Sequence, residues 1–151
     1  MELEINKTYT FKIENFQFGD LTSDVLTLMF KDGRICSPFI QMQLQVWFPT
    51  LKYVNAAGFD HIAIDGQKFE HKSFTKGGCN FAPSSMVGSG RKVEPTLVME
   101  HIVKENLKYC VVDIVNFPVI RVRFEMGIDM IQKYGKCKIP FKDRETFFGK
   151  S

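Results

Sequence analysis

The sequence predicts a mixed α+β domain in which a central mixed β-sheet is flanked by helices. At 151 residues the chain suits one ordinary domain and is too short for two comfortable ones. Segments with helical and strand-like periodicity follow one another in the order helix–hairpin–helix–hairpin–helix. The sequence has no internal repeat or linker-like composition break. We therefore expect a single domain over 1–151.

The first 50 residues predict a strand or extended arm followed by two helices. Residues 7–13 alternate, and Gly33 is expected to stop a helix over 21–30. Ser37 predicts an N-cap with Pro38 at the first helical position, and apolar residues at helical spacing continue that helix over 40–48. That stretch also alternates, so a strand stays open as the second interpretation. The apolar face expected on the first helix consists of Leu21, Val25, Leu28 and Met29.

The middle of the chain predicts a hairpin, and the remainder predicts helices around a second hairpin. Residues 59–74 read as two short strands around the Asp65-Gly66 turn, and a glycine-rich stretch follows. Thr96 can cap a helix that runs to about Asn106. The later elements are strands over 109–115 and 119–126, a short helix over 127–134, and a basic tail containing KIPF at 138–141.

Composition and charge limit the classes of function. No apolar run approaches the ~20 residues that span a bilayer, and the N-terminus has no hydrophobic signal core, so we expect a cytoplasmic protein without a membrane partner. The four cysteines are scattered without a CxxC pair, which argues against zinc and favours buried free thiols. Basic residues gather in 66–92 and 133–150, which suits a polyanionic partner.

The first hairpin carries the residues on which the functional interpretation depends. Asp60 and Glu70 offer two carboxylates, and Lys72 projects from the same face of its strand as Glu70. Such a set suits phosphodiester hydrolysis, because carboxylates hold a hard cation and an ammonium stabilises developing negative charge. A three-residue loop ending at Gly66 would set Asp60 opposite Glu70, whereas a two-residue loop would set it opposite His71 unless a bulge intervened.

The spacing Asp60-(nine residues)-Glu70-His71-Lys72 resembles the PD-(D/E)XK nuclease signature. The run GFDHIAIDGQKFEHKSFTKGG is similar to the catalytic hairpin of small homodimeric Type II restriction endonucleases. This resemblance implies a restriction-endonuclease-like fold. It also implies catalytic roles for Asp60, Glu70 and Lys72, and Mg²⁺ bound by Asp60, Glu70 and the His71 backbone carbonyl. By the same resemblance, we expect Mn²⁺ to substitute for Mg²⁺.

The chain departs from this family pattern at two points. Phe59 stands where the family often has proline before the aspartate. No glutamate occurs between Asn15 and Phe69, where several members carry a helical one, so a second metal site lacks its expected ligand.

The glycine-rich segment after the hairpin would read DNA sequence by the same resemblance. Its side chains include donors and acceptors suited to base edges and lysines suited to phosphates. An ordinary flexible surface loop is the alternative. The candidate DNA-binding residues are Lys76, Asn80, Ser84, Ser85, Arg91 and Lys92.

The function expected from these features is Mg²⁺-dependent, sequence-specific cleavage of double-stranded DNA by a Type II restriction enzyme acting as a homodimer. Residues 1–50 would be a helical dimerisation region, 58–126 the catalytic core sheet and 127–151 a basic C-terminal segment. A homing or phage-encoded endonuclease of the same fold is one alternative. A catalytically inactive DNA-binding module is another.

Overall fold

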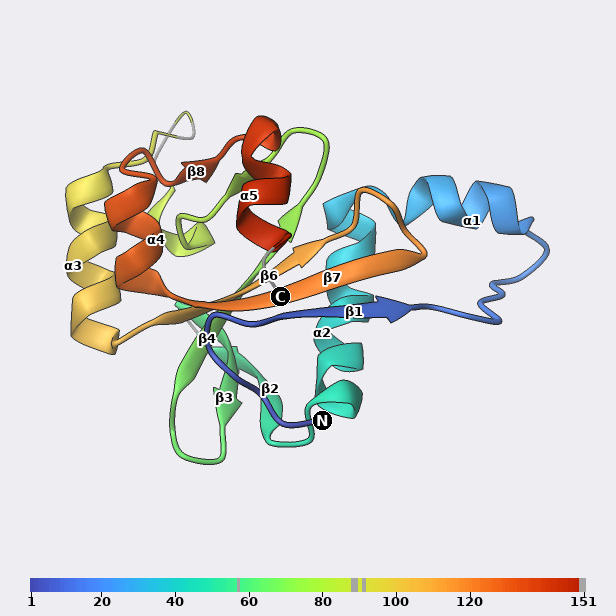
Figure 1. Cartoon of the computed structure of the whole chain (residues 1–151), viewed down its shortest axis with the longest axis horizontal. Helices are drawn as coiled ribbons and strands as arrows, with labels where there is room; N and C mark the ends of the chain where they lie inside the picture. The colour runs from blue at the N-terminus through green and yellow to red at the C-terminus, as the bar shows by residue number, and fades with distance from the viewer. Residues whose placement is uncertain (57, 88–89, 91, 150–151) are drawn as a thin grey trace.

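The computed structural model describes residues 1–56, 58–87, 90 and 92–149. In this part of the chain a six-stranded sheet runs in the order β1-β7-β6-β4-β3-β2 (Figure 1). Its strands are β1 (Thr8–Lys12), β2 (Leu51–Ala56), β3 (Phe59–Ala63), β4 (Lys68–Phe74), β6 (Lys108–Asp113) and β7 (Val119–Met126). A small second sheet pairs β5 (Cys79–Asn80) with β8 (Lys138–Ile139). The mixed α+β prediction is therefore confirmed.

The helices lie on both faces of the sheet. They are α1 (Ser23–Met29), α2 (Gly33–Trp47), α3 (Pro95–Glu105), α4 (Gly127–Lys133) and α5 (Arg144–Phe148), with the short 3₁₀ turns η1 (Ser84–Met86) and η3 (Phe141–Asp143). In Figure 1, α2 lies on one side of the sheet, and α3, α4 and α5 lie on the other. Helix α1 projects from the body beside α2.

The direction of the strands follows from the connections between them. Strands β2, β3 and β4 form an antiparallel meander, and α3 then carries the chain across to β6, which is parallel to β4. Strands β6, β7 and β1 continue the sheet in antiparallel fashion. Among the strands that the structure describes, only the β4–β6 pair is parallel, and it lies at the centre, where parallel strands are covered on both faces.

Two hydrophobic clusters fill the space between the sheet and its helices. Alternate residues of the central strands point to opposite faces. Phe69, Val112 and Phe124 pack with Ile40 and Leu44 of α2. On the other face a second cluster contains Phe74, Tyr109, Val111, Val98 and Ile102 together with residues of α4 and α5. Glu70 and Lys72 share a strand with Phe74 at even positions, so they belong to the α3 side of the sheet.

The start of α2 differs from the sequence-based prediction. The helix begins at Gly33, and the N-cap is Asp32, whose Oδ1 accepts the Arg34 backbone N–H at 2.9 Å. Gly33 opens the second helix rather than stopping the first. Ser37 and Pro38 lie inside the helix, where the proline costs the bond to the carbonyl four residues earlier. The alternative of a strand in this stretch is wrong.

Three other elements also refine the prediction. Helix α3 begins at Pro95 with Glu94 as N-cap, so Thr96 is not the cap; proline suits the first helical position because no donor is needed there. Strand β2 was not predicted. The face of α1 expected to be apolar includes Leu21, Val25 and Leu28, and it is exposed; the buried residue of the helix is Leu26.

Candidate active site

The turn between β3 and β4 has the three-residue form that the site requires. The Ala63 N–H donates to the Gln67 carbonyl at 2.8 Å, and Gly66 has a left-handed φ of 86°. His61 pairs with Phe69 and Ile62 with Lys68. This register sets Asp60 opposite Glu70, which is the arrangement expected of a three-residue loop.

Asp60 lies where β3 and β4 separate. The β3–β4 ladder ends at the His61–Phe69 pair, and the Asp60 Oδ2 accepts the His71 backbone N–H at 2.8 Å. In a strand the N–H and C=O of one residue point to the same edge. The His71 carbonyl therefore points toward the Asp60 side of β4, which is the orientation that a backbone metal ligand would need.

Glu70 and Lys72 form the second part of the site. The Lys72 Nζ lies 3.2 Å from the Glu70 Oε1, and both side chains are largely buried. Burial raises the pKa of Glu70 to about 7, and Lys72 opposes that rise. The negative charge of Asp60 and a hydrogen bond with it raise the pKa further. Two carboxyl groups and one ammonium thus lie at the site, and when both carboxyl groups are ionised the site carries a net negative charge that attracts a cation.

These residues open onto a large cleft. It has a volume of about 930 Å³ and is lined by Asp60, Glu70 and Lys72 on one side. Helix α2 forms another wall through Ser37, which bonds the hydroxyl of Ser73 at 2.8 Å, and through Gln41. The cleft is wide and open, which suits a polymeric substrate better than an enclosed small molecule.

The corner between α1 and α2 contributes charged residues that sequence reasoning missed. Lys31, Asp32 and Arg34 line the cleft, although they lie far from Asp60 in the sequence. Arg34 is held by a two-point contact in which its Nε and Nη2 donate to the Asp32 carboxylate at 3.2 and 2.8 Å. A sequence signal existed, because these are the only charged residues between Val25 and Leu51.

Two histidines lie behind the site on the α2 face. The His61 Nε2 is 3.0 Å from the Gln41 carbonyl, and His61 is fully buried. Burial lowers the pKa of His61, and it lowers the pKa of His71 to about 3. Both rings are therefore neutral at physiological pH. The His71 ring is buried behind the site, whereas its backbone carbonyl stays the candidate ligand.

The segment expected to bind DNA is only partly at the cleft. Ser84 lines it, while Lys76, Asn80, Ser85 and Lys92 are exposed but do not line it. β5, which contains Asn80, pairs with Lys138–Ile139 of the C-terminal region. Arg91, the remaining candidate, lies outside the described residues.

The oxygen atoms at the hairpin determine which metal ion the site can hold. Within the described ranges, no cluster of three or more His, Cys, Asp and Glu side chains is arranged to hold one. Mg²⁺, however, keeps several waters and needs only one or two carboxylates. Asp60 and Glu70 meet that requirement, and the His71 carbonyl adds a third oxygen on the same side. The residues therefore fit Mg²⁺ and do not suit a zinc cage.

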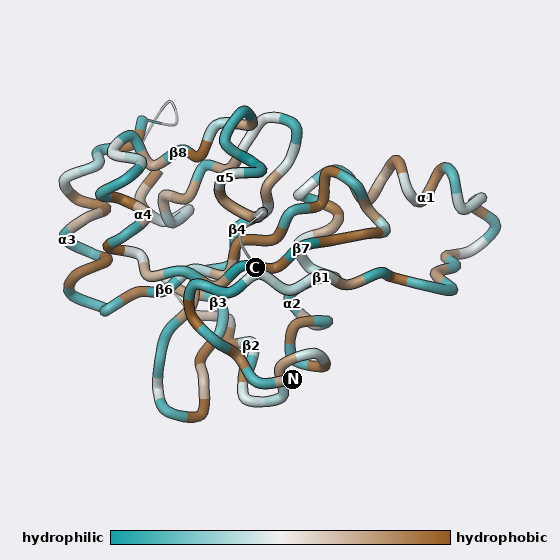
Figure 2. Tube along the Cα trace, viewed as in Figure 1, coloured by the Kyte–Doolittle hydropathy of each residue, from teal (hydrophilic) through white to brown (hydrophobic). Residues whose placement is uncertain are grey.

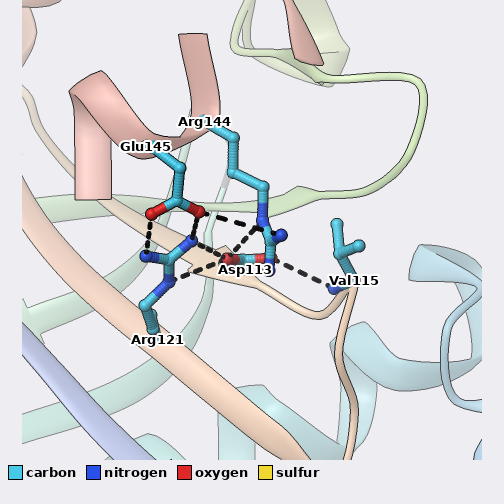
Figure 3. A network of polar contacts seen from close by, with 5 residues as sticks. All are labelled: Asp113, Val115, Arg121, Arg144 and Glu145. Carbon is cyan, nitrogen blue, oxygen red and sulfur yellow. Dashed lines mark hydrogen bonds and ion pairs between the residues drawn. The ribbon is translucent and has the colours of Figure 1, made fainter. Parts of the chain in front are cut away.

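A second polar cluster lies where β6, β7 and α5 meet, and it has a different character. Asp113 is 1% exposed, and its Oδ2 accepts from the Nε of both Arg121 and Arg144, at 3.0 and 2.9 Å (Figure 3). Its Oδ1 accepts the Val115 backbone N–H, and Glu145 accepts two further bonds from Arg121. We call this set the Asp113 network. It joins β6 and β7 to α5, so Arg144 of the basic tail has a structural partner.

The four cysteines, Cys36, Cys79, Cys110 and Cys137, are buried and free, as expected.

No protein-family model, curated protein or solved structure matches this chain. Among the residues that the structure describes, none of the helices has the length and apolar character needed to cross a membrane.

Proposed function

We propose that this chain is a Mg²⁺-dependent endonuclease that hydrolyses phosphodiester bonds in double-stranded DNA. The observation that carries the proposal is the pairing of Asp60 and Glu70 by a three-residue turn, with the Lys72 ammonium 3.2 Å from Glu70. The open cleft and the helices on both faces of a mixed sheet agree with the resemblance to restriction endonucleases. The finer proposal is a Type II restriction enzyme that works in the cytoplasm as a homodimer.

Each side chain has a distinct task in this mechanism. Asp60, Glu70 and the His71 carbonyl would hold Mg²⁺, which supplies positive charge beside the scissile phosphate and acidifies a bound water. The Lys72 ammonium favours the charged form of Glu70 and so keeps it available as a ligand. The same ammonium is placed to donate hydrogen bonds to the attacking water and to the negative charge that develops on the phosphoryl oxygens.

The charged corner at the head of α2 gives the substrate a second contact surface. Lys31 and Arg34 lie on the cleft wall and carry the charge that attracts phosphates. Ser84 stands on the cleft wall as well, at the start of η1, and has the chemistry to contact base edges. A duplex in the cleft would therefore meet the carboxylates, the α1–α2 corner and the start of η1 together.

The experiment is incubation of supercoiled plasmid DNA with the protein in Mg²⁺ or in EDTA. Discrete cleavage bands are expected with Mg²⁺ and none with EDTA. Lys72→Ala should lower the cleavage rate by about 10²–10³-fold, the usual cost of removing a group that stabilises transition-state charge. Lys68→Ala is the matched control, because Lys68 lies on the same face of β4 but pairs with Glu105.

Several outcomes would reject the proposal or narrow it. Binding without cleavage in Mg²⁺ or Mn²⁺ would favour an inactive DNA-binding module. Cleavage that survives Lys72→Ala unchanged would remove the proposed catalytic set. Sequencing the cut ends separates a short palindromic site, typical of restriction, from the long imperfect target of a homing or phage-encoded enzyme.

A further inference from the structure

A small polar cavity lies beside the Asp113 network. It has a volume of about 220 Å³, and β1, the β6–β7 connection, β7 and α5 contribute to its walls. Among the residues that the structure describes, none lines both this cavity and the cleft at the hairpin. The proposed nuclease chemistry therefore makes no use of it. The lining of the cavity includes Thr10, Asn116, Arg121, Arg144 and Glu145.

Two guanidinium groups converge at the cavity. Arg121 comes from β7 and Arg144 from α5, and the Nε atoms of both donate to one oxygen of Asp113 (Figure 3). Their side chains are 19% and 15% exposed, so the surrounding structure holds both groups in place. The Asp113 carboxylate balances one of the two positive charges. The other positive charge needs a second anion.

An exposed side chain of the same chain supplies that second anion. Glu145 is 72% exposed, and its two oxygens accept from the two terminal nitrogens of Arg121 at 3.1 and 2.8 Å. Its Oε1 lies 3.9 Å from the Arg144 Nη1, which is close enough for an ion pair but too long for a hydrogen bond. Exposed ion pairs contribute little to stability, because water competes for both partners. The Glu145 carboxylate is therefore one that another anion can replace.

Helix α5 keeps its position without the Glu145 contact. Figure 2 shows hydrophilic residues at the start of this helix and apolar residues at its end. The apolar residues are Phe147 and Phe148, which are buried in the hydrophobic cluster on this side of the sheet. Release of Glu145 from Arg121 therefore leaves the helix, and Arg144 with it, in place.

Other polar groups at the cavity make no hydrogen bond to the described residues. They are the Thr10 hydroxyl, the Asn116 side-chain amide and the terminal nitrogens of Arg144. Thr10 is the direct partner of Arg121 in the β1–β7 register, so its hydroxyl lies on the same face of the sheet as that guanidinium. The cavity thus combines two guanidinium groups with a hydroxyl and an amide.

This set of donors suits a terminal phosphate group. Guanidinium groups bind phosphate through paired hydrogen bonds, and two of them with a hydroxyl can meet three oxygens. A carboxylate has only two oxygens, and Glu145 places both on Arg121. A phosphodiester likewise leaves two oxygens unsubstituted, whereas a phosphomonoester leaves three. Pockets for drug-sized ligands measure about 300–1,000 Å³, so this smaller cavity fits a phosphate with at most a small substituent.

We propose that this cavity is a binding site for a terminal phosphate, as inorganic phosphate or as a small phosphomonoester. The phosphate replaces the Glu145 carboxylate on Arg121 and also accepts hydrogen bonds from Arg144 and Thr10. Asp113 stays buried beneath the two guanidinium groups and keeps its structural role. The inference goes beyond the proposed nuclease function and does not depend on it, because the cavity and the cleft have separate linings.

The experiment is calorimetric titration of inorganic phosphate into the full chain in EDTA. Wild type should bind one phosphate with a dissociation constant of about 1 mM or lower. Glu145→Gln should tighten binding by up to about fivefold, the equivalent of one exposed ion pair that the phosphate no longer has to break. Arg144→Gln should weaken binding by at least about tenfold, the usual value of a hydrogen bond to a charged group. Lys142→Gln is the matched control, because it removes an exposed positive charge nearby that does not line the cavity.

A second variant covers the case in which Arg144→Gln disturbs the fold. Thr10→Val removes only the hydroxyl, and valine suits a strand position. It should weaken phosphate binding by about fivefold, the value of one hydrogen bond to an anion at an exposed position. Circular dichroism melting in phosphate-free buffer checks that each variant is folded.

Two esters identify the source of the phosphate. Methyl phosphate that binds at least as tightly as inorganic phosphate assigns the site to phosphomonoesters, whereas weaker binding assigns it to free phosphate. Dimethyl phosphate, which represents the internal phosphates of DNA, should bind at least about tenfold more weakly than inorganic phosphate, because it lacks the third free oxygen.

Three results would overturn the inference. One is the absence of saturable phosphate binding by both wild type and Glu145→Gln. Another is binding that Arg144→Gln and Thr10→Val leave unchanged, or that Lys142→Gln weakens equally. The third is equal binding of dimethyl phosphate. A protein that binds phosphate as described but fails to cleave DNA would leave this inference standing and remove only the proposed function.

Discussion

The hairpin site and the Asp113 network both combine carboxylates with cations, and they differ in how fully the charges of the carboxylates are balanced. In the Asp113 network two carboxylates meet two guanidinium groups, and the buried Asp113 accepts three hydrogen bonds. At the hairpin two carboxylates meet one ammonium, and the site opens onto a cleft. A buried charge that is fully paired holds structure together, whereas one left unpaired needs a ligand. The contrast supports the proposal that Asp60 and Glu70 are the functional pair.

The largest expected difference between the two clusters is in stability. Asp113→Ala leaves two largely buried guanidinium groups without their shared partner. It should lower the free energy of unfolding by about 3–5 kcal/mol, as breaking a buried ion pair does. Urea denaturation in EDTA measures this. Glu145→Ala is the control, because Glu145 is 72% exposed and its loss should matter much less. Equal effects of the two changes would refute the compensated network.

The next prediction concerns Glu70 at the hairpin site, where a substitution should raise the free energy of unfolding instead of lowering it. Burial raises the pKa of Glu70 from its usual value to about 7, so the folded state binds a proton more tightly than the unfolded state. The contribution of Glu70 to stability is present below pH 4.5 and is lost as pH rises toward 7. Glu70→Gln should therefore stabilise the metal-free protein at pH 8 by on the order of 2 kcal/mol.

The free energy of unfolding should be measured over a series of pH values for both Glu70→Gln and wild type. The comparison is needed because the buried histidines make stability fall at low pH, whereas Glu70 makes it fall at high pH. The pKa of His71 is lowered, so its contribution falls as pH drops below 6.5. Both proteins contain the same histidines, so subtracting one set of unfolding free energies from the other leaves the contribution of Glu70. Glu100→Gln, an exposed glutamate on α3, should leave the series unchanged. A Glu70→Gln protein less stable than wild type at pH 8 would contradict the uncompensated charge.

A smaller effect concerns the turn that aligns the site. Gly66 and Gly19 both have positive φ, and a Cβ at either would meet nothing within 4 Å. Alanine should therefore cost about 1 kcal/mol at each position through backbone strain alone. Only Gly66→Ala should also lower plasmid cleavage, because only that turn sets Asp60 opposite Glu70. Equal cleavage by both variants would show that the turn does not control the site.

The smallest effect concerns the cleft wall. Arg34→Ala should lower the slope of log affinity against log salt for duplex DNA by up to about 0.9, the value of one phosphate contact. Fluorescence anisotropy with Ca²⁺ in place of Mg²⁺ measures binding without cleavage. Lys104→Ala, an exposed lysine on α3, is the control and should not change the slope. An unchanged slope in the Arg34 variant would remove this wall from the DNA interface.

The hairpin could be predicted from the sequence because its determinants are local. The three-residue turn that ends at Gly66 fixes the register that sets Asp60 opposite Glu70. The strands around the second hairpin were likewise visible in their β-branched composition. In these segments the short-range pattern and the final structure agree.

Other parts of the molecule depend on contacts that no local pattern shows. Strand β2 includes Lys52 and Asn55, and its strand character comes from pairing with β3. Ser37-Pro38 has the form of a helix start, yet Asp32 caps the helix one turn earlier, where Gly33 packs against Ser73 of β4. Lys31 and Arg34 line the cleft only because tertiary packing brings their segment there, and the same is true of the hydrogen bond between Arg144 and Asp113.

Calorimetric titration of Mn²⁺ into the metal-free protein at pH 8 most directly tests the proposed difference between the hairpin site, which should bind a metal ion, and the Asp113 network, which should not. Wild type should bind Mn²⁺, and Asp60→Asn and Glu70→Gln should each weaken that binding by at least about tenfold, since each removes an oxygen ligand and a negative charge. Glu145→Gln, which changes a carboxylate of the compensated network, should bind as wild type does. Binding that is unaltered by the hairpin changes, or that is lost with Glu145→Gln, would contradict the assignment of Asp60 and Glu70 as the metal site.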